Sequence, residues 1–123
     1  MTHRLHKANL FSKTPNSAKI PTYFKGIKQM DFTNQTVIVT GGTRGIGRGI
    51  SEAFLKSGAT VIATYAGNDL AAMKMKEDNI SYGEKIIVKK CDVRDESAVI
   101  DFYKYVEETH PKIEVLINNS GIR

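Results

Sequence analysis

The stretch of this sequence best suited to chemistry is a glycine-rich run, Thr40-Gly41-Gly42-Thr43-Arg44-Gly45-Ile46-Gly47. It follows the apolar, β-branched segment Thr36-Val37-Ile38-Val39 and opens a helical pattern. The N–H groups of such a helix start point at a bound anion, and the helix dipole favours negative charge there. No Gly-Lys-Ser/Thr follows, so an ATP-binding P-loop does not fit. We predict a site for the pyrophosphate of a dinucleotide; the alternative is a strand-to-helix turn that binds nothing.

Three glycines of this loop are expected to have different tasks. Gly41 permits the tight turn off the strand, Gly45 lets the backbone approach a phosphate, and Gly47 lets the helix pack close to the sheet. They fall as G-x-x-x-G-x-G and not as the longer-known G-x-G-x-x-G fingerprint. The prediction therefore depends on the strand before the loop and the helix after it as much as on the glycines.

Alternating strand and helix patterns position this loop. Strands are expected over residues 36–40, 60–65, 85–90 and 113–117, and helices over residues 46–57, 69–78 and 96–109. Asn68 or Asp69 is the expected N-cap of the second helix and Asp95 that of the third, which Pro111 ends. This βαβαβαβ order with short connections predicts an α/β fold: a doubly wound parallel sheet with right-handed crossovers and helices on both faces.

Apolar and small residues mark the expected inner faces of the helices. For the first helix these are Ile46, Ile50, Ala53, Phe54 and Ser57, and for the third Val99, Phe102, Tyr103 and Val106. Met73 and Met75 are interpreted as packing and surface residues of the second helix. Cys91 is interpreted as a small apolar residue at a strand end rather than as a reactive thiol.

Polar motifs follow the carboxyl end of every expected strand. They are the glycine-rich run, Thr64-Tyr65-Ala66, Cys91-Asp92-Val93 and Asn118-Asn119-Ser120-Gly121. With strand order 3-2-1-4, the order reverses between strands one and four, which is where doubly wound sheets bind ligands. The four motifs together predict one crevice for a dinucleotide.

These motifs resemble those of the short-chain dehydrogenase/reductase family over residues 30–123. The glycine-rich run is similar to the family's T-G-x-x-x-G-x-G, N-N-S-G is similar to its N-N-A-G, and Asp92-Val93 matches its Asp-hydrophobe pair. The resemblance implies a Rossmann-type fold in which Asp92 accepts a hydrogen bond from the adenine amino group and Thr40 braces the loop after strand four. The cofactor-binding residues it implies are Thr40, Gly41, Gly42, Thr43, Arg44, Gly45, Ile46, Gly47, Tyr65, Asp92, Val93, Asn118, Ser120 and Gly121.

Simpler interpretations of two motifs remain open. Asp92 can be a helix-capping acid in the turn before Asp95, and the paired asparagines can be a turn signal alone. No cluster in the sequence has metal-ligand spacing apart from an H-x-x-H at His3 and His6, so we predict no metal.

The second strand end bears on the choice between NAD and NADP. An NAD site usually has an acid there, and residues 63–67 contain none. An NADP site needs positive charge near the 2′-phosphate, which Arg44 can supply. By resemblance, an Arg at this position marks NADP-preferring members, so we predict NADP; the alternative is a solvated loop charge.

The family's catalytic Ser and Tyr-x-x-x-Lys are absent, because no Tyr of this sequence has a Lys four residues later. We expect the chain to be the front half of an enzyme, with the cofactor half-site, no catalytic residues and a sheet that stops after the fourth strand. The resemblance is greatest to 3-oxoacyl-[acyl-carrier-protein] reductases. It implies that the full-length form reduces a 3-oxoacyl thioester with NADPH. A homo-oligomer is expected only for that full-length form. The alternative is a non-catalytic nucleotide-binding or interaction module.

Charge divides the chain in two. Residues 1–29 hold six of the 18 Lys and Arg and no acid, which leaves 12 basic and 13 acidic groups over residues 30–123. The nearly neutral remainder gives no indication of nucleic-acid binding. The first 29 residues are a transit-peptide-like extension, a disordered basic tail or, as we favour, a non-native extension before Met30. One cysteine and no apolar run of membrane-spanning length fit a cytoplasmic protein.

Overall fold

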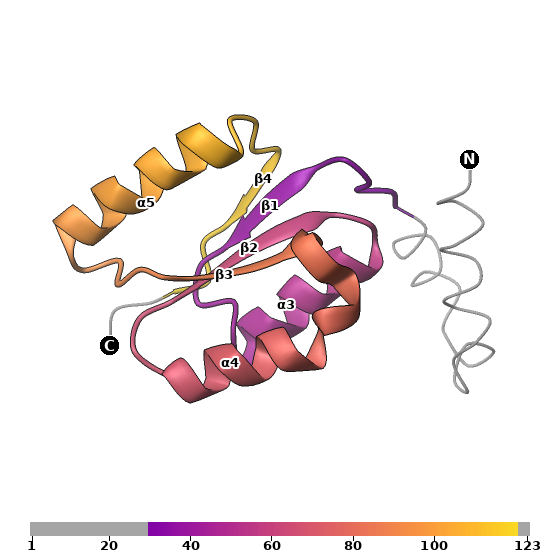
Figure 1. Cartoon of the computed structure of the whole chain (residues 1–123), viewed down its shortest axis with the longest axis horizontal. Coiled ribbons are helices and arrows are strands. Elements are labelled where there is room, and N and C mark those ends of the chain that lie inside the picture. The colour runs from indigo at the N-terminus through magenta and orange to yellow at the C-terminus, as the bar shows by residue number, and fades with distance from the viewer. Residues whose placement is uncertain (1–29, 121–123) are drawn as a thin grey trace.

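The computed structural model describes residues 30–120, so the extension predicted over residues 1–29 and Gly121 lie outside the described residues. The elements are β1 (Thr36–Val39), α3 (Gly45–Lys56), β2 (Thr60–Tyr65), α4 (Asp69–Asp78), the 3-10 helix η2 (Ile80–Lys85), β3 (Ile86–Lys90), α5 (Glu96–Thr109) and β4 (Val115–Ile117) (Figure 1). The predicted bounds of β2, α4 and α5 are confirmed, and β1, β3 and β4 are shorter than predicted.

The four strands form one parallel sheet in the order β3-β2-β1-β4. β1 lies at the centre, where Val37 pairs with Val61 of β2 on one side and with Val115 of β4 on the other. The predicted order is therefore confirmed, and it brings the ends of β1 and β4 side by side.

Two apolar clusters cover the two faces of the sheet, because successive side chains of a strand point to opposite faces. Val37 and Val39 of β1 pack with Leu55 of α3 and Met75 of α4. Ile38 packs on the other face with Val106 of α5. Figure 1 shows this arrangement, with α3 and α4 on one side of the sheet and α5 on the other. The fold is the predicted doubly wound α/β architecture.

The structure corrects the predicted inner face of α3. Ile46 is 79% exposed and Ala53 is also exposed, whereas Gly47, Ser51 and Leu55 are buried. Ile50 and Phe54 pack against the core as predicted. The error arose because the close approach of the loop and β2 to this helix selects small residues, which an apolar pattern does not reveal.

Two further corrections concern α5 and the segment before β3. Tyr103 is 56% exposed, and Tyr105 packs on the core in its place beside Phe102. Lys85, predicted as the first residue of a strand, ends the 3-10 helix η2. The two predicted caps are present: Asn68 accepts from the N–H of Ala71 at 3.0 Å, and Asp95 caps α5.

The helices of residues 30–120 are too short or too polar to cross a membrane.

Candidate functional site

A cavity of about 690 Å³ opens at the carboxyl ends of the strands. The loop after β1 contributes Gly41, Thr43, Arg44, Gly45, Ile46 and Gly47; the segment after β2 contributes Tyr65, Ala66, Gly67 and Asn68; the segment after β3 contributes Cys91, Asp92, Val93 and Arg94; and the loop after β4 contributes Asn119 and Ser120. All four predicted motifs therefore meet at one cavity, because the carboxyl ends of parallel strands share one edge of the sheet.

The glycine-rich loop is shaped by two close backbone approaches. Gly41 has φ of +62°, a conformation that glycine adopts without a steric cost. Gly47 lies so close to it that an added Cβ would stand 1.9 Å from the carbonyl oxygen of Gly41. The predicted close packing of Gly47 is thus present, but its neighbours are the loop itself and Asn119 rather than the sheet.

Helix α3 begins inside this loop, at Gly45. Its N-cap, Arg44, is extended and makes no side-chain capping hydrogen bond, and no acid stands in the first turn. The first N–H groups of a helix have no partner within the helix. The start of α3 therefore offers the cavity N–H donors and the positive end of the helix dipole.

The loop is anchored to its surroundings on both sides of Gly42. Its N–H donates to the carbonyl oxygen of Thr64 at 3.0 Å, and its carbonyl accepts from the hydroxyl of Ser51 at 2.9 Å. Ser51 is fully buried. Gly42 therefore does not line the cavity but ties the loop to β2 and α3.

Thr40 braces the loop after β4. Its hydroxyl oxygen accepts from the N–H groups of Asn119 at 2.9 Å and Ser120 at 3.0 Å. The side-chain amide of Asn119 also donates to the carbonyl of Gly41 at 3.2 Å. These bonds hold the loops after β1 and β4 together at the point where strand order reverses.

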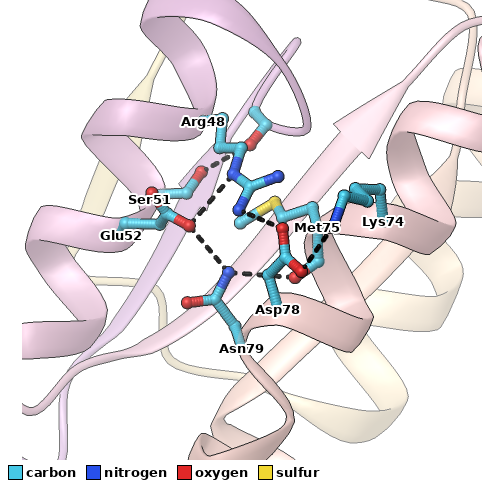
Figure 2. Close-up of polar contacts among 8 residues, drawn as sticks. Arg48, Ser51, Glu52, Lys74, Met75, Asp78 and Asn79 are labelled. Carbon is cyan, nitrogen blue, oxygen red and sulfur yellow. Dashed lines mark hydrogen bonds and ion pairs between the residues drawn. The ribbon is translucent and has the colours of Figure 1, made fainter.

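A polar network fixes α3 against α4 behind the loop (Figure 2). Arg48 donates from Nε to Glu52 at 3.0 Å and from Nη2 to Asp78 of α4 at 2.8 Å. Asn79 donates to Glu52 at 2.8 Å, and Lys74 to Asp78 at 3.0 Å. The hydrogen bond from Arg48 lowers the pKa of Asp78 below its ordinary value. The network stabilises the position of the helix whose first turn faces the cavity.

No acid of the segment after β2 lines the cavity. Asp69, the first residue of α4, does not line it and forms an ion pair, with its Oδ1 3.5 Å from Nζ of Lys90 at the end of β3. Burial, and then a hydrogen bond to Asp69, raises the pKa of Tyr65. The cavity wall here is consequently formed by a neutral phenol, by small residues and by the amide of Asn68.

The segment after β3 carries an ion pair. The carboxylate of Asp92 accepts from the side chain of Arg94 at 3.0 Å and 2.8 Å and from its backbone N–H at 3.0 Å. These hydrogen bonds lower the pKa of Asp92 to about 2. Asp92 does not cap α5, since Asp95 does so. Burial raises the pKa of the Cys91 thiol, which agrees with its interpretation as a packing residue.

Most of the predicted cofactor-binding residues line the cavity. Of those described, Thr40, Gly42 and Asn118 do not. The side-chain oxygen of Asn118 accepts a hydrogen bond from the Thr40 hydroxyl at 3.2 Å. The predicted set lacks six of the lining residues: Ala66, Gly67, Asn68, Cys91, Arg94 and Asn119. Three of them, Ala66, Cys91 and Asn119, belong to the strand-end motifs of the sequence. Over residues 30–120 there is no group of His, Cys, Asp and Glu that could hold a metal ion.

Comparison with known proteins agrees with this geometry. The family described as short chain dehydrogenase matches residues 35–123. Acetoacetyl-CoA reductase of Paracoccus denitrificans is 44% identical over 88 residues, which are 72% of this chain and 34% of that protein. L-rhamnose 1-dehydrogenase (NADP(+)) of Thermoplasma acidophilum is 37% identical over 93 residues, which are 76% of this chain and 37% of that protein.

A solved structure shares this fold. The crystal structure of a short chain dehydrogenase from Bacillus anthracis superposes with a TM-score of 0.67 at 28% identity, covering 73% of this chain and 36% of that one. The chain thus spans about a third of the length of these relatives.

Proposed function

This chain belongs to the short-chain dehydrogenase family, and from that premise we propose that its cavity binds NADP(H) for a reductase of 3-oxoacyl thioesters. The family uses nicotinamide dinucleotides. The similarity to acetoacetyl-CoA reductases supports the substrate class. We further propose that residues 30–123 are the N-terminal part of a dinucleotide-binding domain and that residues 1–29 are a basic, disordered or non-native extension. We also propose that the protein is cytoplasmic.

The residues fit the proposed cofactor. A dinucleotide carries a pyrophosphate, which suits the N–H groups at the start of α3, and the cavity is within the size range of small-molecule sites. When bound, the nicotinamide supplies the hydride for carbonyl reduction. This chain's own residues bind and orient the cofactor: Thr40 and Asn119 fix the loop beside it, and Ser51 holds the loop that faces its phosphates.

The charge of the cavity wall is the observation that carries the choice of NADP. Arg44 and Arg94 are its two cations, and Asp92 is its one acid. No acid among the lining residues follows β2, where an NAD site would place one against the ribose hydroxyls. Arg44 is exposed at the start of α3 and makes no cap bond with the helix. Its guanidinium is therefore the group proposed to receive the 2′-phosphate.

Calorimetric titration with NADPH and NADH tests this proposal. A phosphate–guanidinium hydrogen bond contributes about 1.5–3 kcal/mol, so NADPH is expected to bind about ten- to a hundredfold more tightly. Arg44→Ala removes most of that preference. Lys104→Ala is the matched control, since Lys104 is exposed on α5 and outside the cavity. Equal affinities of the unmutated chain for the two nucleotides would contradict the proposal.

The second candidate is a nucleotide-binding module without catalysis. Oxidation of NADPH in the presence of an acetoacetyl thioester tests whether these 123 residues catalyse the reduction by themselves. We expect the rate with the 123-residue chain to equal the blank. Turnover that Arg44→Ala abolishes would mean that this chain itself catalyses the reduction.

A further inference from the structure

Arg94 uses most of the hydrogen-bonding capacity of Asp92. Its backbone N–H and its Nε both donate to Oδ1 at 3.0 Å, and its Nη2 donates to Oδ2 at 2.8 Å. A carboxylate offers about four acceptor positions, two on each oxygen. Oδ1 is therefore filled, and Oδ2 retains one position. The two-pronged contact also fixes the rotation of the carboxylate, because a planar guanidinium meets both oxygens at once.

The ion pair also sets the charge of this part of the cavity. Arg94 and Asp92 both line it, and their charges compensate each other at 2.8 Å. The net charge of the lining residues is thus that of Arg44 alone. An uncompensated carboxylate would repel a ligand that carries several phosphate charges. Arg94 removes that repulsion while leaving the carboxylate ionised as an acceptor.

We propose that Arg94 is a positioning residue for the adenine end of the cofactor, holding Asp92 so that the remaining position on Oδ2 accepts from the adenine amino group. This inference rests on the proposed binding of NADP(H) and on the contact between Asp92 and the adenine amino group that the family resemblance implies. It assigns Arg94 an orienting role through Asp92, distinct from the phosphate contact proposed for Arg44. If Arg94 has this role, replacing it should reduce the preference of the site for adenine over a base that lacks the amino group.

The experiment compares NADPH with its hypoxanthine analogue, in which a carbonyl oxygen replaces the amino group. A hydrogen bond to a charged acceptor is worth enough for the unmutated chain to bind NADPH at least about tenfold more tightly than the analogue. With Arg94→Met the ratio is expected to fall to about threefold or less, since Asp92 is free to rotate. Arg94→Lys, which keeps the charge without the fork, restores part of the ratio.

The controls separate this role from others. Arg94 is 62% exposed at its side chain, so its replacement removes little packing. Lys104→Met makes the same change in net charge on the exposed side of α5 and is expected to leave the ratio unchanged. An Arg94→Met variant with an unchanged adenine-to-hypoxanthine ratio overturns the inference. So does one that changes only the NADPH-to-NADH ratio, which would make Arg94 a phosphate ligand.

Failure of the inference is distinguishable from failure of the proposed function. If the unmutated chain binds neither NADPH nor NADH, the proposed function is wrong and the inference falls with it. If the chain prefers NADPH to NADH but does not distinguish adenine from hypoxanthine, the proposed function stands and only the role of Arg94 is wrong.

Discussion

Replacing Gly47 by alanine tests how closely the first turn of α3 must approach the loop before it. An added Cβ would stand 1.9 Å from the carbonyl oxygen of Gly41 and 2.6 Å from the side-chain nitrogen of Asn119. Ordinary van der Waals contact begins at 3.4 Å, so the distance between the Cβ at position 47 and the carbonyl oxygen of Gly41 must increase by more than an ångström. Because the nearest atom is backbone, no side-chain rotation relieves the clash.

The expected cost of Gly47→Ala is about 3 kcal/mol, at the upper end of overpacking in a well-packed site. The shift would also separate Asn119 from the carbonyl of Gly41, whose bond measures 3.2 Å. Gly49→Ala is the matched control, two residues later in the same helix, because nothing lies within 4 Å of its added Cβ. That change is expected to stabilise the chain by about 0.5–1 kcal/mol, since alanine favours the helix.

Urea denaturation of the chain and of both variants, followed by circular dichroism, measures these differences. The free energy of unfolding should fall for Gly47→Ala and rise for Gly49→Ala. An unfolding free energy for Gly47→Ala within about 0.5 kcal/mol of the unmutated chain would refute the reasoning. It would mean that the loop can move away from α3 without cost and that Gly47 does not set its position.

Three further predictions concern single polar groups. Thr40→Val leaves two backbone N–H groups after β4 without their acceptor and should lower the free energy of unfolding by about 1–3 kcal/mol in urea denaturation, with Thr40→Ser close to the unmutated chain. Thr64→Val should raise it by about 1 kcal/mol by the same measurement, because the buried hydroxyl of Thr64 has no hydrogen-bond partner among residues 30–120. Hydrogen bonds from Arg94 lower the pKa of Asp92 to about 2, so the ionised Asp92 should stabilise the fold fully above pH 4 and lose this effect as the pH falls through about 2. An NMR titration of Asp92 should give a midpoint of about 2. In Arg94→Met the midpoint should return towards the ordinary value of 3.8.

Local sequence determines the order and type of the elements. β-branched runs such as Thr36–Val39 favour strands, and Asn68 and Asp95 begin helices because their side chains accept from free N–H groups. Short connections between alternating strands and helices leave a parallel sheet as the compatible arrangement. Local patterns do not distinguish one doubly wound strand order from another. The order 3-2-1-4 comes from the Rossmann-type arrangement, and the structure confirms it.

Tertiary contacts decide which residues face inward and which partners a polar side chain finds. Ser51 is buried and Ile46 exposed because α3 lies close to Gly42 and to β2, a distance that no local periodicity encodes. Tyr105 rather than Tyr103 meets the core because the orientation of α5 on the sheet is set by packing.

The site shows the same division. The sequence by itself determined that Asp92 stands at a strand end, as a residue type that accepts hydrogen bonds. Only the structure decided that Arg94 occupies three acceptor positions of Asp92 and that Asn119 of the loop after β4 bonds to Gly41 of the loop after β1. The physical reason is that residue type and periodicity reflect the local backbone. The partner of Asn119 depends on the distance between two segments that packing brings together, and the contacts of Arg94 depend on the turn and the side-chain conformation after β3.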